Sequence, residues 1–183
     1  MSSNENYRKL LSEELHRISP EEYKSSEKHP FVIVLDNIRS ASNVGSAFRT
    51  GDSLRVEAVY LCGYTCVPPN KELQKTALGA QLSVPWKHFD NTVDALSDLK
   101  SQGYEIVSVE QVEHSTKLQD FRVEKNKKYA FVFGNEVHGV ADEVIAQSDC
   151  CLEIPQYGTK HSFNVSVTCG IVLWEAVRQF LFE

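Results

Sequence analysis

Three blocks of the sequence combine amide, carboxylate, hydroxyl and guanidinium side chains with glycines, and such groups can bind and orient a ligand. The blocks are DNIRSASNVGSAFRTGD from residue 36, FGNEVHGVADEV from residue 133 and IPQYGTKHSFNVSVTCGIVLWE from residue 154. Each block follows or completes a short apolar run that is typical of a buried β-strand. Because ligands of open parallel sheets collect at the loops after the strands' carboxyl ends, the blocks together indicate a candidate site.

Several common sites of α/β proteins are excluded by the residues themselves. No G-x-G-x-x-G occurs, which disfavours a Rossmann dinucleotide site. Gly134 and Gly139 have the separation of a P-loop, but Val140 and Ala141 stand where Lys and Ser or Thr would have to bind phosphate and magnesium. No G-x-S-x-G elbow of a hydrolase is present.

The elements that must position these blocks can be predicted from apolar periodicity. Five runs rich in β-branched residues predict strands at residues 31–36, 56–62, 104–110, 129–134 and 150–154. Helical patterns between them fall at residues 43–54, 70–78, 91–102, 140–147 and 163–180. This alternation predicts an α/β fold with a mainly parallel sheet and helices on both faces.

The first 29 residues are expected to form a helical arm and a linker ahead of a domain at residues 30–183. Apolar residues recur at helical spacing from Tyr7 to Ile18, and Pro20 is expected to stop that pattern. Residues 21–29 are charged and lack periodicity, which is typical of a linker.

Composition indicates an ordinary globular protein. The chain has 183 residues, of which 42% are hydrophobic, and 19 Lys and Arg stand against 25 Asp and Glu, for a net charge of −6. This balance does not indicate a nucleic-acid binder, although residues 31–90 carry one more basic than acidic side chain. No unbroken apolar run approaches the ~20 residues of a membrane span, and no secretory signal opens the chain, so we expect a cytoplasmic protein.

The five cysteines form an odd set at positions 62, 66, 150, 151 and 169. Without an export signal, we expect reduced and largely buried thiols rather than a disulfide scaffold. Neither close pair has the C-x-x-C spacing of a zinc site, and no metal is predicted.

Taken singly, the polar blocks have structural interpretations, since Asn43 and Asn164 suit helix caps and Gly134 and Gly139 suit turns. Taken jointly and in order, they resemble the signature motifs of the SpoU (TrmH-like) family of SPOUT-class RNA ribose methyltransferases. The resemblance extends over residues 31–180. The matching stretches are Asn43 to Thr50, Phe133 to Gly139, Ile154 to Ser166 and the intermediate Lys75 to Ala80.

The resemblance implies a fold, a reaction and partners. The fold would add a deep trefoil knot near the C-terminus to the parallel sheet. The methyl donor would be S-adenosylmethionine and the acceptor a ribose 2′-hydroxyl in structured RNA, either tRNA or rRNA. Family members usually act as homodimers, and the apolar last helix suits a dimer contact. Two alternatives stay open: a non-catalytic RNA-binding or assembly factor of the same fold, and a SPOUT enzyme that methylates a base.

The resemblance also assigns residues to roles. The expected cofactor contacts are Gly134, Asn135, Ile154, Gln156 and Phe163. Glycine at 134 would allow a close backbone approach to the cofactor, whereas Gln156 and Phe163 replace the Met and Leu more common in the family. The expected catalytic residues are Arg49, Asn43, Glu136, Ser162 and Asn164. The expected RNA contacts are Arg39, Arg49 and Lys75.

Arg49 matches the family's essential arginine, which is often described as the base that removes the hydroxyl proton. A guanidinium keeps its proton near neutral pH, so we expect Arg49 to grip an RNA phosphate and to stabilise the developing alkoxide. His138 is an alternative base because imidazole titrates near neutral pH, but the motif does not require a histidine there.

Overall fold

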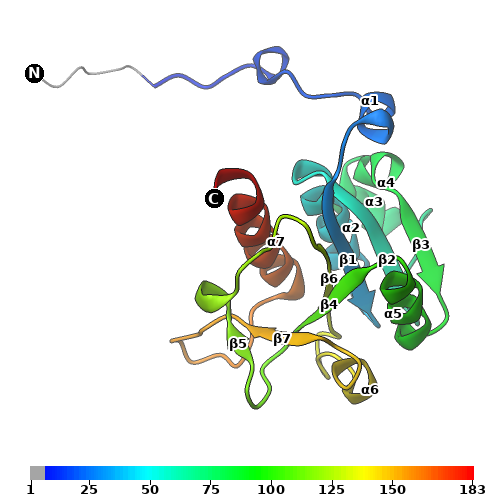
Figure 1. The fold of residues 1–183 in the computed structure, drawn as a ribbon. Coiled ribbons are helices and arrows are strands. Elements are labelled where there is room, and N and C mark those ends of the chain that lie inside the picture. The colour runs from blue at the N-terminus through cyan, green and yellow to red at the C-terminus, as the bar shows by residue number, and fades with distance from the viewer. Residues whose placement is uncertain (1–6) are drawn as a thin grey trace, which may run out of the picture.

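The computed structural model describes residues 7–183, which fold around one parallel sheet (Figure 1). Within these residues the strand order is β3-β2-β1-β6-β4-β7-β5, and every neighbouring pair is parallel. The strands are β1 (His29–Asp36), β2 (Val56–Cys62), β3 (Trp86–Phe89), β4 (Tyr104–Val109), β5 (Thr116–Lys117), β6 (Lys128–Phe133) and β7 (Cys150–Glu153). The helices are α1 (Pro20–Ser25), α2 (Ala41–Ser53), α3 (Lys71–Ala77), α4 (Ala80–Ser83), α5 (Thr92–Ser101), α6 (Asp142–Ile145) and α7 (Val165–Phe182), with 3₁₀ turns η1 (Ser12–Leu15) and η2 (Leu118–Asp120).

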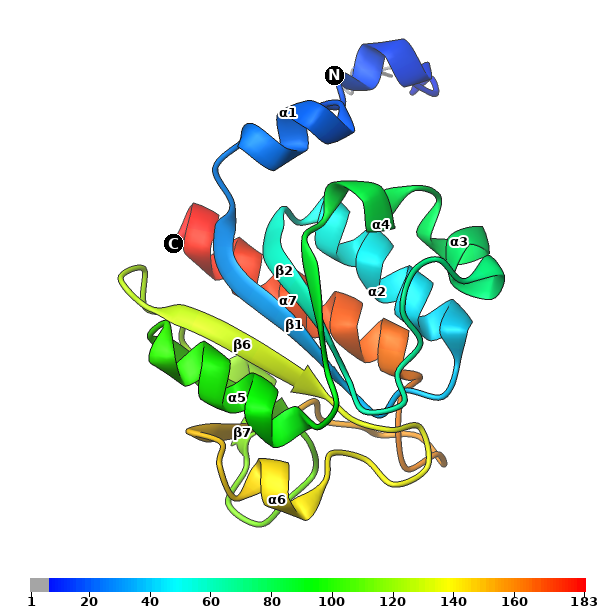
Figure 2. The same cartoon turned by 90° about the vertical axis from the view of Figure 1, so that its right-hand side faces the viewer.

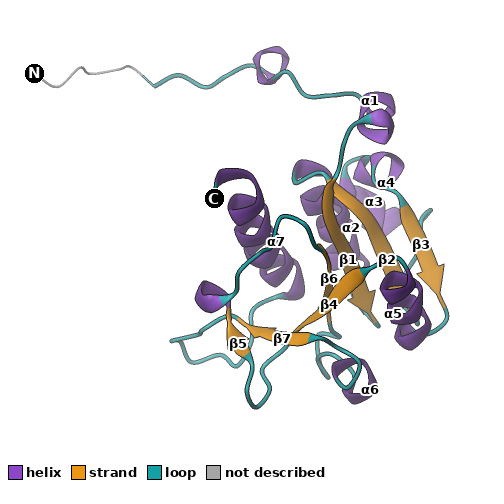
Figure 3. Cartoon of the chain, viewed as in Figure 1, coloured by secondary structure: helices purple, strands orange, loops and turns teal. Residues whose placement is uncertain are grey.

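Two apolar clusters cover the two faces of the sheet, and strand β1 contributes to both. Phe31, Ile33 and Leu35 belong to the cluster shared with α2 and α7, whereas Val32 and Val34 belong to the cluster shared with α5 and α6. All five side chains are at most 2% exposed. A parallel strand buried on both faces needs an unbroken apolar run, which is why β1 could be predicted from sequence. Figures 2 and 3 show helices on both sides of the strands.

The five predicted strands and the parallel sheet are confirmed, and the structure adds two edge strands. Strand β3 has four residues that are mostly exposed, and β5 has two residues, so neither carries the apolar run by which strands were predicted. Asn164 caps α7, as expected. Helix α2 begins earlier than expected because Ser40 rather than Asn43 is its N-cap, and α6 has four residues instead of the eight expected. The trefoil knot stays a prediction.

The N-terminal arm differs from the sequence prediction. The expected helix ending before Pro20 is wrong, since residues 7–18 contain only the turn η1 and α1 begins at Pro20. Proline suits the first turn of a helix because its missing N–H needs no partner there, and Ser19 and Glu22 form a capping box. The segment expected as a linker therefore starts with a helix, while the domain boundary before residue 30 stays a prediction.

Tyr23 fastens α1 to the sheet. Its side chain is 2% exposed, and its hydroxyl donates to the carbonyl of Val56 at 2.9 Å. Burial raises the pKa of this phenol, so it stays a neutral donor at physiological pH. Residues 7–19 extend away from the sheet in Figures 1 and 2, and their apolar side chains Tyr7 and Leu11 are exposed.

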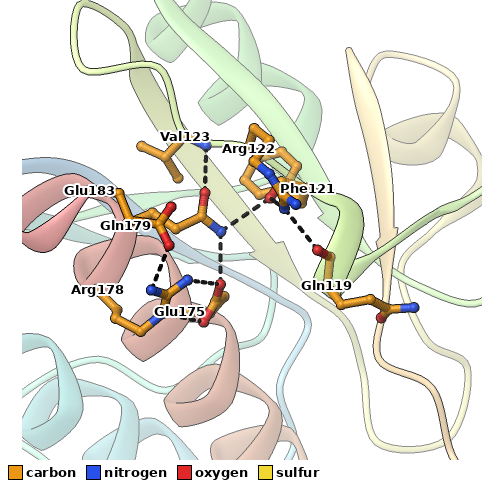
Figure 4. Close-up of polar contacts among 8 residues, drawn as sticks. All are labelled: Gln119, Phe121, Arg122, Val123, Glu175, Arg178, Gln179 and Glu183. Atoms are coloured by element: carbon orange, nitrogen blue, oxygen red, sulfur yellow. Dashed lines mark hydrogen bonds and ion pairs between the residues drawn. The ribbon is translucent and has the colours of Figure 1, made fainter.

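The last helix, α7, is both apolar and anchored in the domain. By length and composition its 18 residues, with a mean hydropathy of 1.4, could cross a membrane. Its buried face nevertheless includes the polar Gln179, which is 3% exposed. The Gln179 amide accepts from the backbone N–H of Val123 at 2.9 Å and donates to the carbonyl of Phe121 at 3.1 Å (Figure 4). These bonds hold α7 against the connection that leads into β6.

Candidate active site

A cavity of about 640 Å³ opens at the carboxyl ends of β4, β6 and β7. Its volume lies in the ~300–1,000 Å³ range of small-molecule sites. The second and third sequence blocks supply most of the wall, and the structure thereby brings together residues that are far apart in the chain. The predicted site residues in the wall are Gly134, Asn135, Glu136, Ile154, Gln156, Ser162, Phe163 and Asn164.

Glu136 connects the second block to the first. One carboxylate oxygen accepts from the backbone N–H of Arg39 at 2.9 Å. The other accepts from the backbone N–H of Ser40 at 3.0 Å and from the side-chain amide of Asn43 at 2.9 Å. Asn43 in turn accepts from the side-chain amide of Asn164 at 3.2 Å, so all three blocks meet in one hydrogen-bonded network.

This network maintains the charge of Glu136. Partial burial would raise the pKa of the carboxyl, but the hydrogen bonds from Arg39, Asn43 and Ser40 outweigh burial and leave the pKa below its usual range. Glu136 is therefore an ionised acceptor at neutral pH. In this state it positions the start of α2 and has no proton to donate.

The loop after β6 has no room for a side chain at Gly134. A Cβ there would lie 2.1 Å from backbone atoms of Gly139 and Val140. Gly139 adopts a φ of +70°, and it exchanges two backbone hydrogen bonds of 2.9 Å with Asn135. The glycine at 134 was expected to allow the close approach of a cofactor, but the packing of the loop on itself already requires it.

Asn135 lines the cavity with a side chain whose hydrogen bonds are made within the protein. Its amide nitrogen donates to the carbonyl of Asn37 at 2.7 Å and lies 2.6 Å from the hydroxyl of Tyr64. Its amide oxygen accepts from the backbone N–H groups of Val137 and His138. Asn135 therefore shapes the wall and has little capacity left to hydrogen-bond a ligand.

Glu110 lines the cavity although it was not among the predicted site residues. It follows β4, and its carboxylate accepts from the backbone N–H groups of Val140 at 3.0 Å and Gln111 at 2.8 Å. The signal that could have found it is a carboxylate directly after a buried strand, at the sheet edge that carries the other blocks.

The domain as a whole matches a known family. The model of the SpoU rRNA Methylase family matches residues 30–174, which include the first two blocks and all but the last residue of the third. The chain belongs to this family. The resemblance stated from the motifs is thereby confirmed.

Curated proteins of the SpoU family resemble the chain over most of its length. A tRNA (guanosine(18)-2'-O)-methyltransferase of Aquifex aeolicus is 30% identical over 171 residues, which are 93% of this chain and 78% of that protein. The 23S rRNA (guanosine-2'-O-)-methyltransferase RlmB of Neisseria meningitidis is 32% identical over 150 residues, which are 82% of this chain and 59% of that protein. The chain thus spans less than two thirds of the second relative.

Solved SpoU structures share the fold. The TrmH/SpoU tRNA modifying enzyme of Aquifex aeolicus superposes with a TM-score of 0.75 at 30% identity, over 87% of this chain and 79% of that chain. An AdoMet-bound rRNA methyltransferase from Sinorhizobium meliloti gives a TM-score of 0.77 at 25% identity, over 91% of this chain and 62% of that chain. The α/β fold class is therefore that of the SpoU enzymes.

The remaining predicted residues of this SpoU domain lie outside the cavity. Arg49 and Lys75 line a separate hollow of about 410 Å³ formed by residues of α2 and α3 with the turn after α2. Arg49 is exposed and lies six residues after Asn43, which corresponds to about 9 Å along a helix. Lys75 pairs with Glu72 at 2.6 Å, and the exposed Arg39 contributes its backbone to the network. Within one chain, Arg49 therefore does not line the cavity.

Thiols and metal ligands do not form a centre within residues 7–183. No group of three or more His, Cys, Asp or Glu side chains in this part of the chain is placed to hold a metal ion. The five cysteines are free. Burial raises the pKa of Cys62 to about 12 and also raises the pKa of Cys169, so both thiols are protonated core residues.

Proposed function

We propose that this protein transfers a methyl group from S-adenosylmethionine to a ribose 2′-hydroxyl of tRNA or rRNA. The proposal rests on the meeting of Asn43, Glu136 and Asn164, one from each SpoU motif, at a cavity of small-molecule size. The relatives named above are 2'-O-methyltransferases of tRNA and rRNA, which favours ribose over a base as the acceptor. A purely RNA-binding role would not need the complete network.

The lining of the cavity fits the cofactor. Ile154 and Phe163 supply apolar surface beside the Gly134 loop, and Gln156 adds an amide. These residues would hold S-adenosylmethionine, whose methyl group is already activated by a sulfonium. The task left to the protein is to align the 2′-oxygen with that methyl group and to stabilise the negative charge that develops.

The polar residues divide this task. Glu136 and Asn164 fix the start of α2 through Asn43. Ser162 lies in the cavity wall, where its hydroxyl can donate to or accept from the acceptor ribose. Arg49 would bind an adjacent RNA phosphate and stabilise the alkoxide, for which its planar fork of donors is suited.

A homodimer would explain how Arg49 can act on the reacting ribose although it does not line the cavity of its own chain. Because Arg49 lies away from the cavity of its own chain, a second copy is the source that could supply it to the reacting ribose. Exposed apolar residues of α7, such as Trp174 at 54% and Val167 at 48%, offer a contact surface. We therefore assign the apolar character of α7 to a partner subunit rather than to a membrane, and place the enzyme in the cytoplasm.

Methyl transfer to fractionated RNA tests the proposed function. The protein and labelled S-adenosylmethionine are incubated with bulk tRNA in one reaction and with bulk rRNA in another. We expect label in nuclease-resistant dinucleotides, since a 2′-O-methyl group blocks cleavage at its own linkage. Label in a modified base would replace the proposal by base methylation. Cofactor binding without transfer to either RNA would favour a non-catalytic RNA-binding factor.

A further inference from the structure

The loop between β7 and α7 presents an aromatic side chain to solvent beside the cavity. Tyr157 is 95% exposed, whereas Gln156 and His161 on either side of the loop tip line the cavity. The base of the loop is fixed, because the carbonyl of His161 accepts from the Gln111 amide at 2.7 Å and from the Gln156 amide at 3.3 Å. The tip at residues 157–160 thus projects into solvent from a fixed base at the cavity rim.

Packing does not explain the residues at this tip. Tyr157, Thr159 and Lys160 are all exposed, and a Cβ at Gly158 would meet nothing within 4 Å. A tyrosine this exposed buries almost no apolar area and so contributes little to the stability of the fold. An aromatic ring at this position therefore suits a ligand that arrives from solvent.

The charge of the loop favours a polyanion as that ligand. The chain carries a net charge of −6, yet residues 155–164 contain no Asp or Glu and include Lys160 and His161. The cavity wall itself carries the carboxylates of Glu110, Glu136, Asp142 and Glu153. The loop at residues 155–164 is therefore the part of the cavity rim whose charge suits a phosphate.

We propose that Tyr157 is the stacking platform for a nucleobase beside the ribose that is methylated, with Lys160 next to it for a backbone phosphate. The inference rests on the proposed function, since it takes the cavity as the site of methyl transfer. Aromatic side chains stack on the faces of unpaired bases, and a tyrosine has few rotamers to lose in doing so. The substrate class is therefore RNA with unpaired nucleotides at the target, such as a loop or a bulge.

Steady-state methylation of the bulk RNA tests Tyr157 with the full-length protein. Tyr157→Ala should raise the KM for RNA by about 5- to 150-fold, the equivalent of ~1–3 kcal/mol per stacked base. Its affinity for S-adenosylmethionine and its kcat at saturating RNA should stay near those of the wild type. Tyr157→Phe should retain the wild-type KM because it keeps the ring. Thr159→Ala, a change in the same exposed tip, serves as the matched control and should have no effect.

The possible outcomes separate this inference from the proposed function. An active wild type with an unchanged KM in Tyr157→Ala overturns the stacking role and leaves the reaction intact. An equal loss in Tyr157→Phe or Thr159→Ala also overturns it, because the hydroxyl or the loop shape would then matter. If the wild type transfers no methyl group, filter binding of the same RNAs tests the stacking role of Tyr157 directly. Weaker binding by Tyr157→Ala alone supports the stacking role without the reaction, and equal binding by all variants overturns it.

Discussion

The side chains of Asn43 and Asn164 meet at 3.2 Å although 121 residues separate them in the chain. Asn43 lies in the first turn of α2 and Asn164 caps α7, so the contact joins the starts of two helices that are remote in sequence. The amide of Asn43 also donates to Glu136. The three SpoU motifs therefore form one unit, and changes within it should be coupled.

Coupling between the two asparagines can be measured with Asn43→Ala, Asn164→Ala and the double variant. Each single change should slow single-turnover methyl transfer. The rise in activation free energy of the double variant should be smaller than the sum of the two single rises, by about 0.5–3 kcal/mol, because either single change already removes the shared hydrogen bond. Asn91→Ala is the control, since Asn91 caps α5 away from the site. It should lower stability by ~1 kcal/mol and leave the rate unchanged. Strict additivity would show that the asparagines act separately.

Stability should depend on pH through Glu136. The folded protein holds the pKa of this carboxyl below its unfolded value. Its contribution is therefore fully present above the unfolded pKa near ~4.3 and is lost as the pH falls through the lowered folded value. Glu136→Gln should be less stable than the wild type at neutral pH, and the difference should shrink in acid. Denaturant titrations across this range check the prediction, with Glu13→Gln as a control on the arm. A difference independent of pH would contradict it.

Arg49→Ala should bind S-adenosylmethionine normally but transfer methyl groups more slowly. The loss should be ~10²–10³-fold, as expected for removal of one preorganised donor. Arg49→Lys should rescue little, because a point charge cannot replace a bidentate fork. Lys71→Ala, which removes an exposed cation at the start of α3, should leave the rate unchanged. Wild-type rates in both Arg49 variants would remove this residue from the mechanism.

A shared active site predicts complementation between two inactive subunits. Arg49→Ala keeps its own cavity, and Phe163→Asp keeps its own arginine while placing a charge in the cavity wall. Mixed dimers should regain part of the activity, because one of the two sites would combine an intact cavity with an intact Arg49. Native mass spectrometry can verify that subunits have exchanged. Inactive mixed dimers would indicate that Arg49 acts at the cavity of its own subunit.

Gly134 and Phe163 should separate folding from cofactor binding. Gly134→Ala should lower the melting temperature, because its Cβ would collide with the backbone of Gly139 and Val140. Phe163→Ala should keep the melting temperature and weaken the binding of S-adenosylmethionine, since this side chain is 43% exposed and lines the cavity. Calorimetry of both variants measures the two effects. Unchanged cofactor affinity in a folded Phe163→Ala would remove Phe163 from the site.

The parts of the fold that could be predicted are those marked by a local sequence pattern, such as an apolar run or a helix-cap residue. Strand β1 is apolar because both of its faces are buried, and the cap at Asn164 has a local residue preference. Strand β3 was missed because an exposed edge imposes no apolar run. The start of α1 was missed because Pro20 was interpreted as a stop, although the capping box of Ser19 and Glu22 makes it a beginning.

The candidate site was predicted less completely than the fold. Motif residues could be named, but their distribution between a cavity and a separate hollow depends on helix faces and loop packing. Arg49 shows this, since its motif neighbour Asn43 reaches the network while Arg49 lines the other hollow. Glu110 was missed because its partners are backbone N–H groups, which no side-chain motif records.

The two edges of the sheet limit how copies of this protein can aggregate through strand pairing. The edge strands β3 and β5 have only four and two residues. A long flat edge offers unpaired backbone groups to a strand of another molecule, whereas short edges give such a strand little to pair with. Extension of the sheet from one molecule into the next is thereby disfavoured. Short strands at both edges therefore work against fibre growth by edge-to-edge pairing of this sheet.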